Sequence, residues 1–518
     1  MDLKLYDTTL RDGTQGEGIS LSVDDKLKIA RRLDELGIDY LEGGWPGSNP
    51  KDAAFFQRIA RDGLTHAKPT AFGMTRRAGG RAGEDANLQA LLEAETPVVT
   101  IVGKTSTLHV ERVLGTSRDE NLRMIADSVG YCKSRGREVV YDAEHFFDGV
   151  RLDREYAHAT LRAAAEAGAD CLVLCDTNGG ELPHVVAERV VDLRTQVQTP
   201  LGIHTHNDSG LALANALAAV LAGCGHVQGT INGYGERCGN MDLVPLIATL
   251  QLKLGYPLLA PERLRELTEV AHVVAAVANV NPDPRQPYVG RSAFAHKGGI
   301  HVAAVAKVAE SYQHIDPALV GNEMRVVVSE LAGRQNIGLR ARALGLSVEG
   351  READLLQRIK ELEHAGVQFE GADGSFEMLV RRAALDYHPP FEMLGFTVVV
   401  QEDNGAGVRA QAMAKLRVGG AVIHTAAEGA GPVNALDRAV RAGLLPHYPE
   451  LADVRLVDYK VRIVDEHFGT AAKPRVVLES AAGPERWSTV GCSDNIIEAS
   501  WQALRDSLEL PLLRHPRA

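Results

Sequence analysis

The first 250 or so residues alternate short apolar runs with longer amphipathic stretches, and this alternation restricts the fold more than any other feature. Repeated strand–helix units favour a parallel sheet, because each helix returns the chain to the same edge. Eight such units predict an α/β protein built on a closed (β/α)8 TIM barrel, with a doubly wound open sheet as the alternative. The candidate strands are residues 3–7, 39–44, 69–73, 98–103, 138–144, 171–176, 201–206 and 226–230.

The stretches between these runs carry helix signals. Residues 22–37 begin with Ser22, a good N-cap, continue with acids in the first turn, and end at Gly37, a good C-cap. Residues 154–168 have the same build and also end in a glycine, Gly168. These signals predict helices that cross over between the barrel strands.

The rest of the chain shows two further sequence patterns. Residues from about 260 to 380 look mainly helical, and from residue 391 a pattern of strands followed by a helix occurs twice. We therefore expect three regions: the barrel (1–260), a helical linker region (261–385) and a C-terminal α+β domain (386–518).

The composition narrows the function classes. A formal net charge of −12 argues against nucleic acid as a partner. No apolar run approaches the ~18 residues that a membrane span needs. The six cysteines are scattered without close pairing, which fits reduced thiols, so we expect a cytoplasmic protein.

One motif at the end of the seventh predicted strand can bind a metal. Residues two apart in a strand face the same side, so His204 and His206 point together, and neutral imidazoles are good ligands for divalent ions. An H-x-H motif alone is equally typical of two strand-end histidines with ordinary hydrogen bonds. Asn207 and Asp208, which follow directly, are interpreted as supports that hold the imidazoles.

Two other turns strengthen the metal interpretation. The turn after the first strand contains Arg11 and Asp12, although a surface turn could hold them for turn propensity alone. The loop after the eighth strand ends with Asn240, an oxygen ligand, and its glycines lack the spacing of a dinucleotide fingerprint. Strands one, seven and eight are neighbours in a closed barrel, so these side chains are expected to meet.

Three motifs together resemble a known family: DTTLRDG (7–13), HTHND (204–208) and NGYGERCGN (232–240). The family is that of the metal-dependent, Claisen-condensing barrel enzymes, which includes the isopropylmalate, homocitrate and citramalate synthases and hydroxymethylglutaryl-CoA lyase. The resemblance covers almost the whole chain and implies that Asp12, His204 and His206 bind a divalent ion, with Asn240 completing the ligand set. Mn2+, Mg2+, Zn2+ and Co2+ are the candidate ions.

The same resemblance implies roles for further residues. Arg11 binds substrate and stabilises the oxygen that gains charge, and Glu144 is the catalytic base. Asp142 and Thr177 belong to the substrate pocket. The segment 295–322 is similar to the family's mobile cap, in which His301 and Tyr312 are the expected catalytic groups and His296 is the second-best histidine.

Within the family, the turn EGGWPGSNPKD (42–52) is similar to that of the group that forms citramalate. The expected reaction joins acetyl-CoA, pyruvate and water to give (R)-citramalate and CoA, as in isoleucine biosynthesis. An isopropylmalate or homocitrate synthase is the alternative. A lyase that runs the reverse cleavage and a non-catalytic amino-acid sensor are more remote interpretations.

The C-terminal region resembles the allosteric dimerisation domain of these synthases. The resemblance implies a homodimer that binds isoleucine as its effector. Pro432 stands at the start of a predicted helix whose free backbone N–H groups could hold a carboxylate. A dimerisation module without a ligand is the alternative.

Overall fold

The computed structural model describes residues 3–329, 331–348, 350–403, 407–464 and 466–515. The chain divides into two compact units. The first contains the residues up to Phe294 together with Ile315–Glu323, and the second contains Ala295–His314 and the residues from Met324 onward. The three-region division at residues 260 and 385 stays a prediction.

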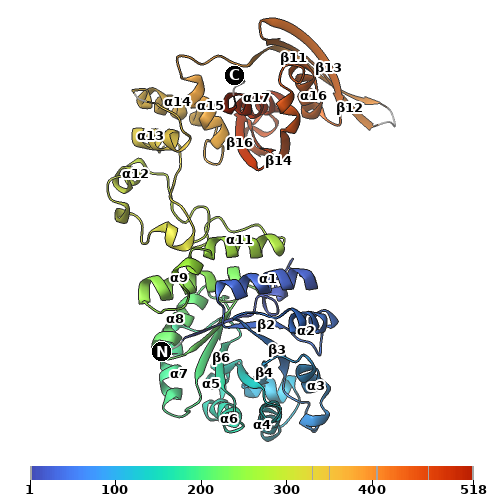
Figure 1. The fold of residues 1–518 in the computed structure, drawn as a ribbon, viewed down its shortest axis with the longest axis vertical. Helices are drawn as coiled ribbons and strands as arrows, with labels where there is room; N and C mark the ends of the chain where they lie inside the picture. Colours follow the sequence, from blue (N-terminus) through green and yellow to red (C-terminus); the bar gives the residue numbers. More distant parts are fainter. Residues whose placement is uncertain (1–2, 330, 349, 404–406, 465, 516–518) are drawn as a thin grey trace. The chain divides into compact units, whose positions relative to one another are not determined.

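The first unit is a closed barrel of eight parallel strands in chain order (Figure 1). Closure occurs where β1 pairs with β8, with Lys4 opposite His226 and Asp7 opposite Gly229. The prediction of a (β/α)8 barrel is confirmed, and each strand begins and ends within one residue of its predicted bounds. The strands are β1 (Lys4–Asp7), β2 (Tyr40–Gly44), β3 (Lys68–Met74), β4 (Val98–Lys104), β5 (Glu138–Glu144), β6 (Cys171–Asp176), β7 (Leu201–Thr205) and β8 (His226–Gly229).

Helices connect these strands, and the predicted caps are present. The Ser22 side chain accepts a hydrogen bond from the Asp25 backbone N–H, and Gly37 ends α1 with a φ of 105°. The helices of this unit are α1 (Val23–Leu36), α2 (Pro50–Asp62), α3 (Ala86–Glu93), α4 (Arg118–Ser134), α5 (Phe146–Leu152), α6 (Arg154–Glu166), α7 (Pro183–Arg194), α8 (Ala212–Ala222), α9 (Leu243–Leu254), α10 (Pro261–Leu264) and α11 (Leu267–Val277).

Most of the apolar core lies between the strands and these helices. A smaller buried cluster, which includes Tyr6, Tyr40, Val140 and Cys171, fills the inside of the barrel. The interior is therefore packed, as is usual for this fold, and its functional side chains belong at the C-terminal ends of the strands.

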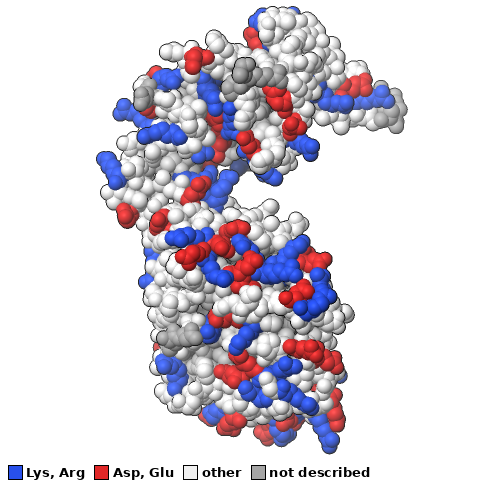
Figure 2. Space-filling view, in the orientation of Figure 1, with Lys and Arg blue, Asp and Glu red and all other residues white. Residues whose placement is uncertain are grey.

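The outer surface carries both signs of charge. Figure 2 shows acidic and basic side chains interspersed over the helices of the barrel. Ion pairs join many of them, such as Arg32 on α1 with Glu269 on α11, whose charged atoms are 2.9 Å apart. Exposed pairs of this kind each contribute little to stability. Among the described residues, no helix combines the length and the hydrophobicity that crossing a bilayer requires.

The second unit begins with a helical part and ends with two sheet-and-helix modules. Each module has three antiparallel strands followed by one helix, which confirms the predicted duplication. The helical part contains α12 (Gly299–Val305), α13 (Arg334–Ala343), α14 (Glu352–His364) and α15 (Asp373–Arg382), with the short paired strands β9 (Ala295–His296) and β10 (Arg325–Val326). The modules are β11 (Phe391–Asp403), β12 (Gly407–Val418), β13 (Ala421–Gly429) and α16 (Pro432–Leu444), then β14 (Arg455–Ile463), β15 (Pro474–Ala482), β16 (Glu485–Cys492) and α17 (Ile496–Arg514).

Candidate active site

A cavity of about 330 Å3 opens at the C-terminal end of the barrel. Its walls come from side chains at or just beyond the ends of the strands, where barrel enzymes place their chemistry. Most of the predicted site residues line it: Arg11, Asp12, Asp142, Glu144, Thr177, His204 and His206.

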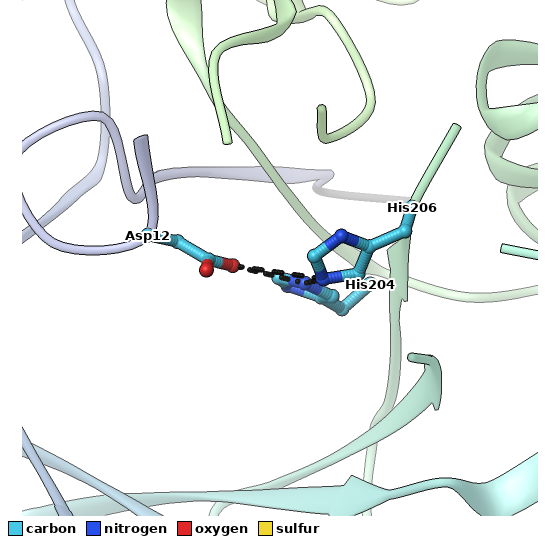
Figure 3. A group of neighbouring side chains, drawn as sticks. All are labelled: Asp12, His204 and His206. Atoms are coloured by element: carbon cyan, nitrogen blue, oxygen red, sulfur yellow. Dashed lines mark hydrogen bonds and ion pairs between the residues drawn. The ribbon is translucent and has the colours of Figure 1, made fainter. Parts of the chain in front are cut away.

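Three of these side chains converge on one point (Figure 3). The Nε2 atoms of His204 and His206 lie 3.3 Å apart, because both side chains leave the same side of β7. Asp12 reaches them from the turn after β1, with Oδ2 3.3 Å from His204 Nε2 and 3.9 Å from His206 Nε2. Their ligand atoms all lie within 4.8 Å of one another, so they form a candidate metal site.

Asn240, the fourth predicted ligand, is also adjacent to this group. It is buried beside His206, with which it forms an isolated β-bridge. Its Nδ2 donates to the Tyr234 carbonyl at 3.1 Å, while its Oδ1 has no hydrogen-bond partner among the described residues. A buried amide oxygen without a donor is costly, and a cation would satisfy it. The donor set of one carboxylate, two imidazoles and one amide oxygen fits a divalent metal.

The position of the Asn240 side chain depends on a glycine in the same loop. Gly235 has a φ of 154°, and a Cβ atom there would lie 2.2 Å from Asn240 Nδ2. Any side chain at residue 235 would therefore displace the amide. The loop after β8 needs this glycine in order to present Asn240 toward the histidines.

The charges of the group also suit a cation. Burial acts to raise the pKa of Asp12, but the Arg11 guanidinium and the two histidines outweigh it and lower that pKa well below its usual range. Burial and the neighbouring His204 lower the pKa of His206 to about 4, so this imidazole is neutral near pH 7. The pKa of His204 is raised, because its contact with Asp12 outweighs burial.

Arg11 is held by a carboxylate that was not among the predicted site residues. Glu42 on β2 is fully buried, and its Oε1 accepts hydrogen bonds from Arg11 Nε at 2.6 Å and from Thr8 Oγ1 at 2.5 Å. The guanidinium carbon also lies 3.8 Å from the centre of the Phe72 ring. The guanidinium is thus fixed at the cavity wall. A charged residue within an otherwise apolar strand was the sequence signal for Glu42.

Glu144 is the last residue of β5, which lies across the closed barrel from β1, the strand that precedes Arg11. It forms an ion pair with Lys104 at the end of β4, a residue that was also missed. Thr177 lies nearby, because its Oγ1 accepts a hydrogen bond from the His145 backbone N–H at 2.9 Å. No hydrogen bond from this hydroxyl to another described residue competes, so its proton can be donated to another acceptor.

Two expectations about supporting residues are wrong. Asp208 does not hold an imidazole, because its carboxylate pairs with Arg237 at 2.7 Å. Asn207 accepts a hydrogen bond from the backbone N–H of Ala212, the first residue of α8. His204 is supported by Gln228 on β8, which the sequence did not single out.

The two predicted cap residues lie in the second unit. His301 is on α12, Tyr312 follows a short 3-10 turn (Ala309–Ser311), and their rings stack with centroids 4.3 Å apart. Both side chains are exposed, whereas His296 is half-buried on β9. Their roles in catalysis stay predictions.

Comparison with known proteins identifies the families that parts of this chain match. Residues 2–274 match the HMGL-like model, residues 288–366 match the homocitrate synthase post-HMGL domain-like model, and residues 370–511 match the LeuA allosteric (dimerisation) domain.

Three relatives that match over nearly their whole length are (R)-citramalate synthases. The chain is 51% identical to the (R)-citramalate synthase of Geobacter sulfurreducens, over 98% of this chain and 97% of that protein. It is 51% identical to that of Synechocystis sp., over 98% and 96%, and 48% identical to that of Aquifex aeolicus, over 98% of both. The chain therefore belongs to the HMGL-like family and, within it, to the family of the (R)-citramalate synthases.

Proposed function

We propose that this chain condenses acetyl-CoA with pyruvate and water to give (R)-citramalate and CoA. The observation that carries the proposal is the cavity that brings the Asp12–His204–His206 group together with Arg11 and Glu144. The relatives that match over nearly the full chain are (R)-citramalate synthases, which supports (R)-citramalate as the product. The leucine and lysine branches of the family, isopropylmalate and homocitrate synthase, are the competing reactions.

We assign Asp12, His204, His206 and Asn240 as the residues that hold a divalent metal. When bound, the ion supplies a Lewis acid that polarises the keto group of the 2-oxo acid. Borderline nitrogen donors mixed with oxygens suit Mn2+, Zn2+ or Co2+, and Mg2+ remains a candidate through the oxygens. Metal removal and reloading distinguishes these ions.

Arg11 stabilises the charge that develops on the keto oxygen. Its guanidinium always carries a proton and is already oriented by Glu42 and Phe72, so little reorganisation is needed during the reaction. A donor of this kind contributes roughly 3 kcal/mol to transition-state stabilisation in comparable sites.

Glu144 is the general base. Its carboxylate removes a proton from the methyl carbon of the acetyl thioester, and the released electron pair forms the new C–C bond to the keto carbon of pyruvate. The carbonyl π pair moves onto the keto oxygen, which then takes up a proton. Water hydrolyses the thioester, so that CoA leaves as the free thiol. Lys104 keeps the Glu144 carboxylate at the cavity wall.

Thr177 and Asp142 complete the substrate pocket. The free hydroxyl proton of Thr177 suits the pyruvate carboxylate. Pyruvate is smaller than 2-oxoisovalerate by two methyl groups, and discrimination in an apolar pocket is worth only about 1–3 kcal/mol per methylene-sized difference. Some side activity with longer 2-oxo acids is therefore expected.

His301 and Tyr312 act as further catalytic groups of the cap. This assignment is supported by their stacked, exposed rings, which leave the imidazole nitrogens and the phenol accessible to a ligand. We expect the histidine to transfer a proton and the tyrosine to contact the thioester.

The C-terminal modules form a homodimer that is inhibited by isoleucine. Support comes from the match to the LeuA allosteric (dimerisation) domain and from a cavity of about 440 Å3. Its walls combine the start of α16 at Gly431 and Pro432 with the apolar side chains Leu456, Ile497 and Leu504. Free backbone N–H groups at a helix start suit the effector's carboxylate, and the apolar wall suits its branched side chain.

All six cysteines are free thiols, which supports a cytoplasmic location.

The direct test uses purified full-length protein that has been stripped with a chelator. Reloaded with Mn2+, Mg2+, Zn2+ or Co2+ and given acetyl-CoA and pyruvate, it should release free CoA and form (R)-citramalate, identified by chiral chromatography. Isoleucine should lower that rate. If no loaded form releases CoA, the proposed function is wrong; if isoleucine has no effect, only the effector assignment is wrong.

A further inference from the structure

A buried glutamine links two of the site residues inside the barrel. Gln228 on β8 lies opposite His204 of β7 in the parallel register. Its Oε1 is 2.9 Å from His204 Nδ1, and its Nε2 donates to Asp142 Oδ1 on β5, also at 2.9 Å. All three side chains are buried. The line Asp142–Gln228–His204 therefore crosses the barrel interior directly beneath the candidate metal site.

The chemistry of the amide fixes the direction of both hydrogen bonds. A carboxylate accepts, so Gln228 must turn its NH2 group toward Asp142. Its carbonyl oxygen then faces His204, and a carbonyl can only accept. In the neutral form, which metal binding requires, the imidazole proton consequently resides on Nδ1, which leaves the lone pair of Nε2 directed toward Asp12 and His206.

We propose that Gln228 is a positioning residue that sets the tautomer and the ring orientation of His204 for metal binding, and that Asp142 acts by orienting the Gln228 amide. The inference rests on the proposed metal role of His204. Asp142 thus has a task at the metal site in addition to its place in the cavity wall. Without Asp142 the amide could rotate and present its NH2 group to the imidazole, which would move the proton to Nε2 and occupy the lone pair.

The first experiment measures metal affinity of the chelator-stripped full-length protein by calorimetric titration with Mn2+ and Zn2+. Gln228→Leu keeps bulk but removes the acceptor, and affinity should fall on the order of 10- to 100-fold. In Gln228→Glu, the new carboxyl group shares one proton with Asp142 and still accepts the hydrogen bond from His204 Nδ1. The metal affinity of this variant should therefore lie closer to that of the wild type. Gln251→Leu is the matched control, since Gln251 makes two amide hydrogen bonds to Leu259 in the same unit. Wild-type affinity in Gln228→Leu would overturn the proposal.

A second experiment separates this relay from a direct role of Asp142. Asp142→Ala should weaken metal binding in the wild-type background and have no further effect in the Gln228→Leu background, because Asp142 acts through Gln228. Equal effects in both backgrounds would contradict the relay. The 15N chemical shifts of the His204 ring should change from an Nδ1-protonated to a mixed tautomer in either variant, a signature that a purely structural role would not produce.

His204→Ala keeps the two proposals distinguishable. If this variant retains the metal, the metal assignment itself is wrong. If it loses the metal while Gln228→Leu binds it normally, only the relay is wrong. Should Gln228→Leu fail to fold, the comparison of Gln228→Glu with Asp142→Ala tests the same point.

Discussion

His204 and His226 are two buried histidines on the neighbouring strands β7 and β8, and each is 5% exposed. His204, at the C-terminal end of the barrel, has polar partners on both ring nitrogens: Gln228 on one, and Asp12 with His206 on the other. His226, at the N-terminal end, lies between the rings of Tyr6 and Tyr40, with centroids 5.2 and 5.5 Å away. Its Nε2 has no hydrogen-bond partner among the described residues.

The electrostatic consequences are opposite. Burial lowers the pKa of His226 to about 3, whereas the pKa of His204 is raised because Asp12 compensates for burial. Equal burial thus produces a neutral packing residue at one end and a residue of the candidate metal site at the other. Polar partners, rather than burial, distinguish a functional histidine from a structural one.

The two ends of the barrel also differ in how their polar groups are paired. A cavity of about 500 Å3 at the N-terminal end is lined by charged groups such as Lys4 and Glu138, but these are already paired. Lys4 binds Asp39 at 3.1 Å, and Tyr40 donates to Glu138 at 2.6 Å. The cavity at the C-terminal end is instead lined by Asp12, His204 and His206, the candidate metal-binding group. The charged groups at the N-terminal end thus pair within the fold, whereas the C-terminal end carries the candidate active site, the usual place for one in this fold.

The largest effect should come from His204→Ala. Removing one of the four proposed ligands should abolish metal retention and lower kcat by more than about 1000-fold, while the circular dichroism spectrum stays unchanged. Metal content by elemental analysis and CoA release check this prediction. His226→Gln is the paired control and should keep both metal and turnover; if His226→Gln were equally inactive, the distinction between the two ends would be lost.

Glu144→Gln should come next. The amide keeps the shape of the side chain but cannot accept the methyl proton, so kcat should fall about 100- to 10,000-fold. The KM for pyruvate and the metal content should change little. Steady-state kinetics measure kcat and the KM for pyruvate. A change confined to KM would argue for a binding role of Glu144 instead.

A smaller loss is expected for Glu42→Gln. The amide can accept one hydrogen bond from Arg11 but loses the charge that orients the guanidinium, so kcat should fall roughly 10- to 100-fold, less than for removal of Arg11 itself. The pyruvate KM and kcat are measured for Glu42→Gln and Arg11→Lys side by side. An Arg11→Lys variant as active as wild type would refute the assignment of Arg11.

The smallest effect concerns stability and pH. The folded pKa of His226, about 3, lies below its ordinary value of 6.5, so the unfolded chain binds a proton that the folded chain does not. His226 therefore does not lower the free energy of unfolding above pH 6.5. As the pH falls from 6.5 toward 3, the free energy of unfolding decreases by about 1.4 kcal/mol per pH unit. His226→Gln should remove this loss. Urea unfolding at pH 7.5 and pH 5.5 checks it: an identical pH dependence in both proteins would contradict the pKa shift.

The sequence predicted the elements of the barrel well, because each depends on local signals. Two-residue alternation placed His204 and His206 on one side of β7, and Ser22 and Gly37 marked the ends of α1. The residues that escaped prediction are those that the assembled barrel brings together from different strands. Glu42 meets Arg11 across β1 and β2, Lys104 meets Glu144 across β4 and β5, and Gln228 joins β5 to β7.

The error at Asn207 and Asp208 has the same origin. Sequence adjacency suggested that they support the imidazoles, but the turn after β7 directs them to α8 and to Arg237. A residue on the neighbouring strand, invisible to a local pattern, performs that task instead. Local patterns therefore identify the proposed ligands, and tertiary contacts identify the residues that hold them.

The most direct test of the account is kcat/KM for CoA release, measured with metal-loaded protein and acetyl-CoA against pyruvate, 2-oxobutyrate, 2-oxoisovalerate and 2-oxoglutarate. The account predicts the highest value for pyruvate, complete loss on chelation, and recovery when a divalent metal is restored. A higher value for 2-oxoisovalerate or 2-oxoglutarate, or turnover that survives chelation, would contradict it.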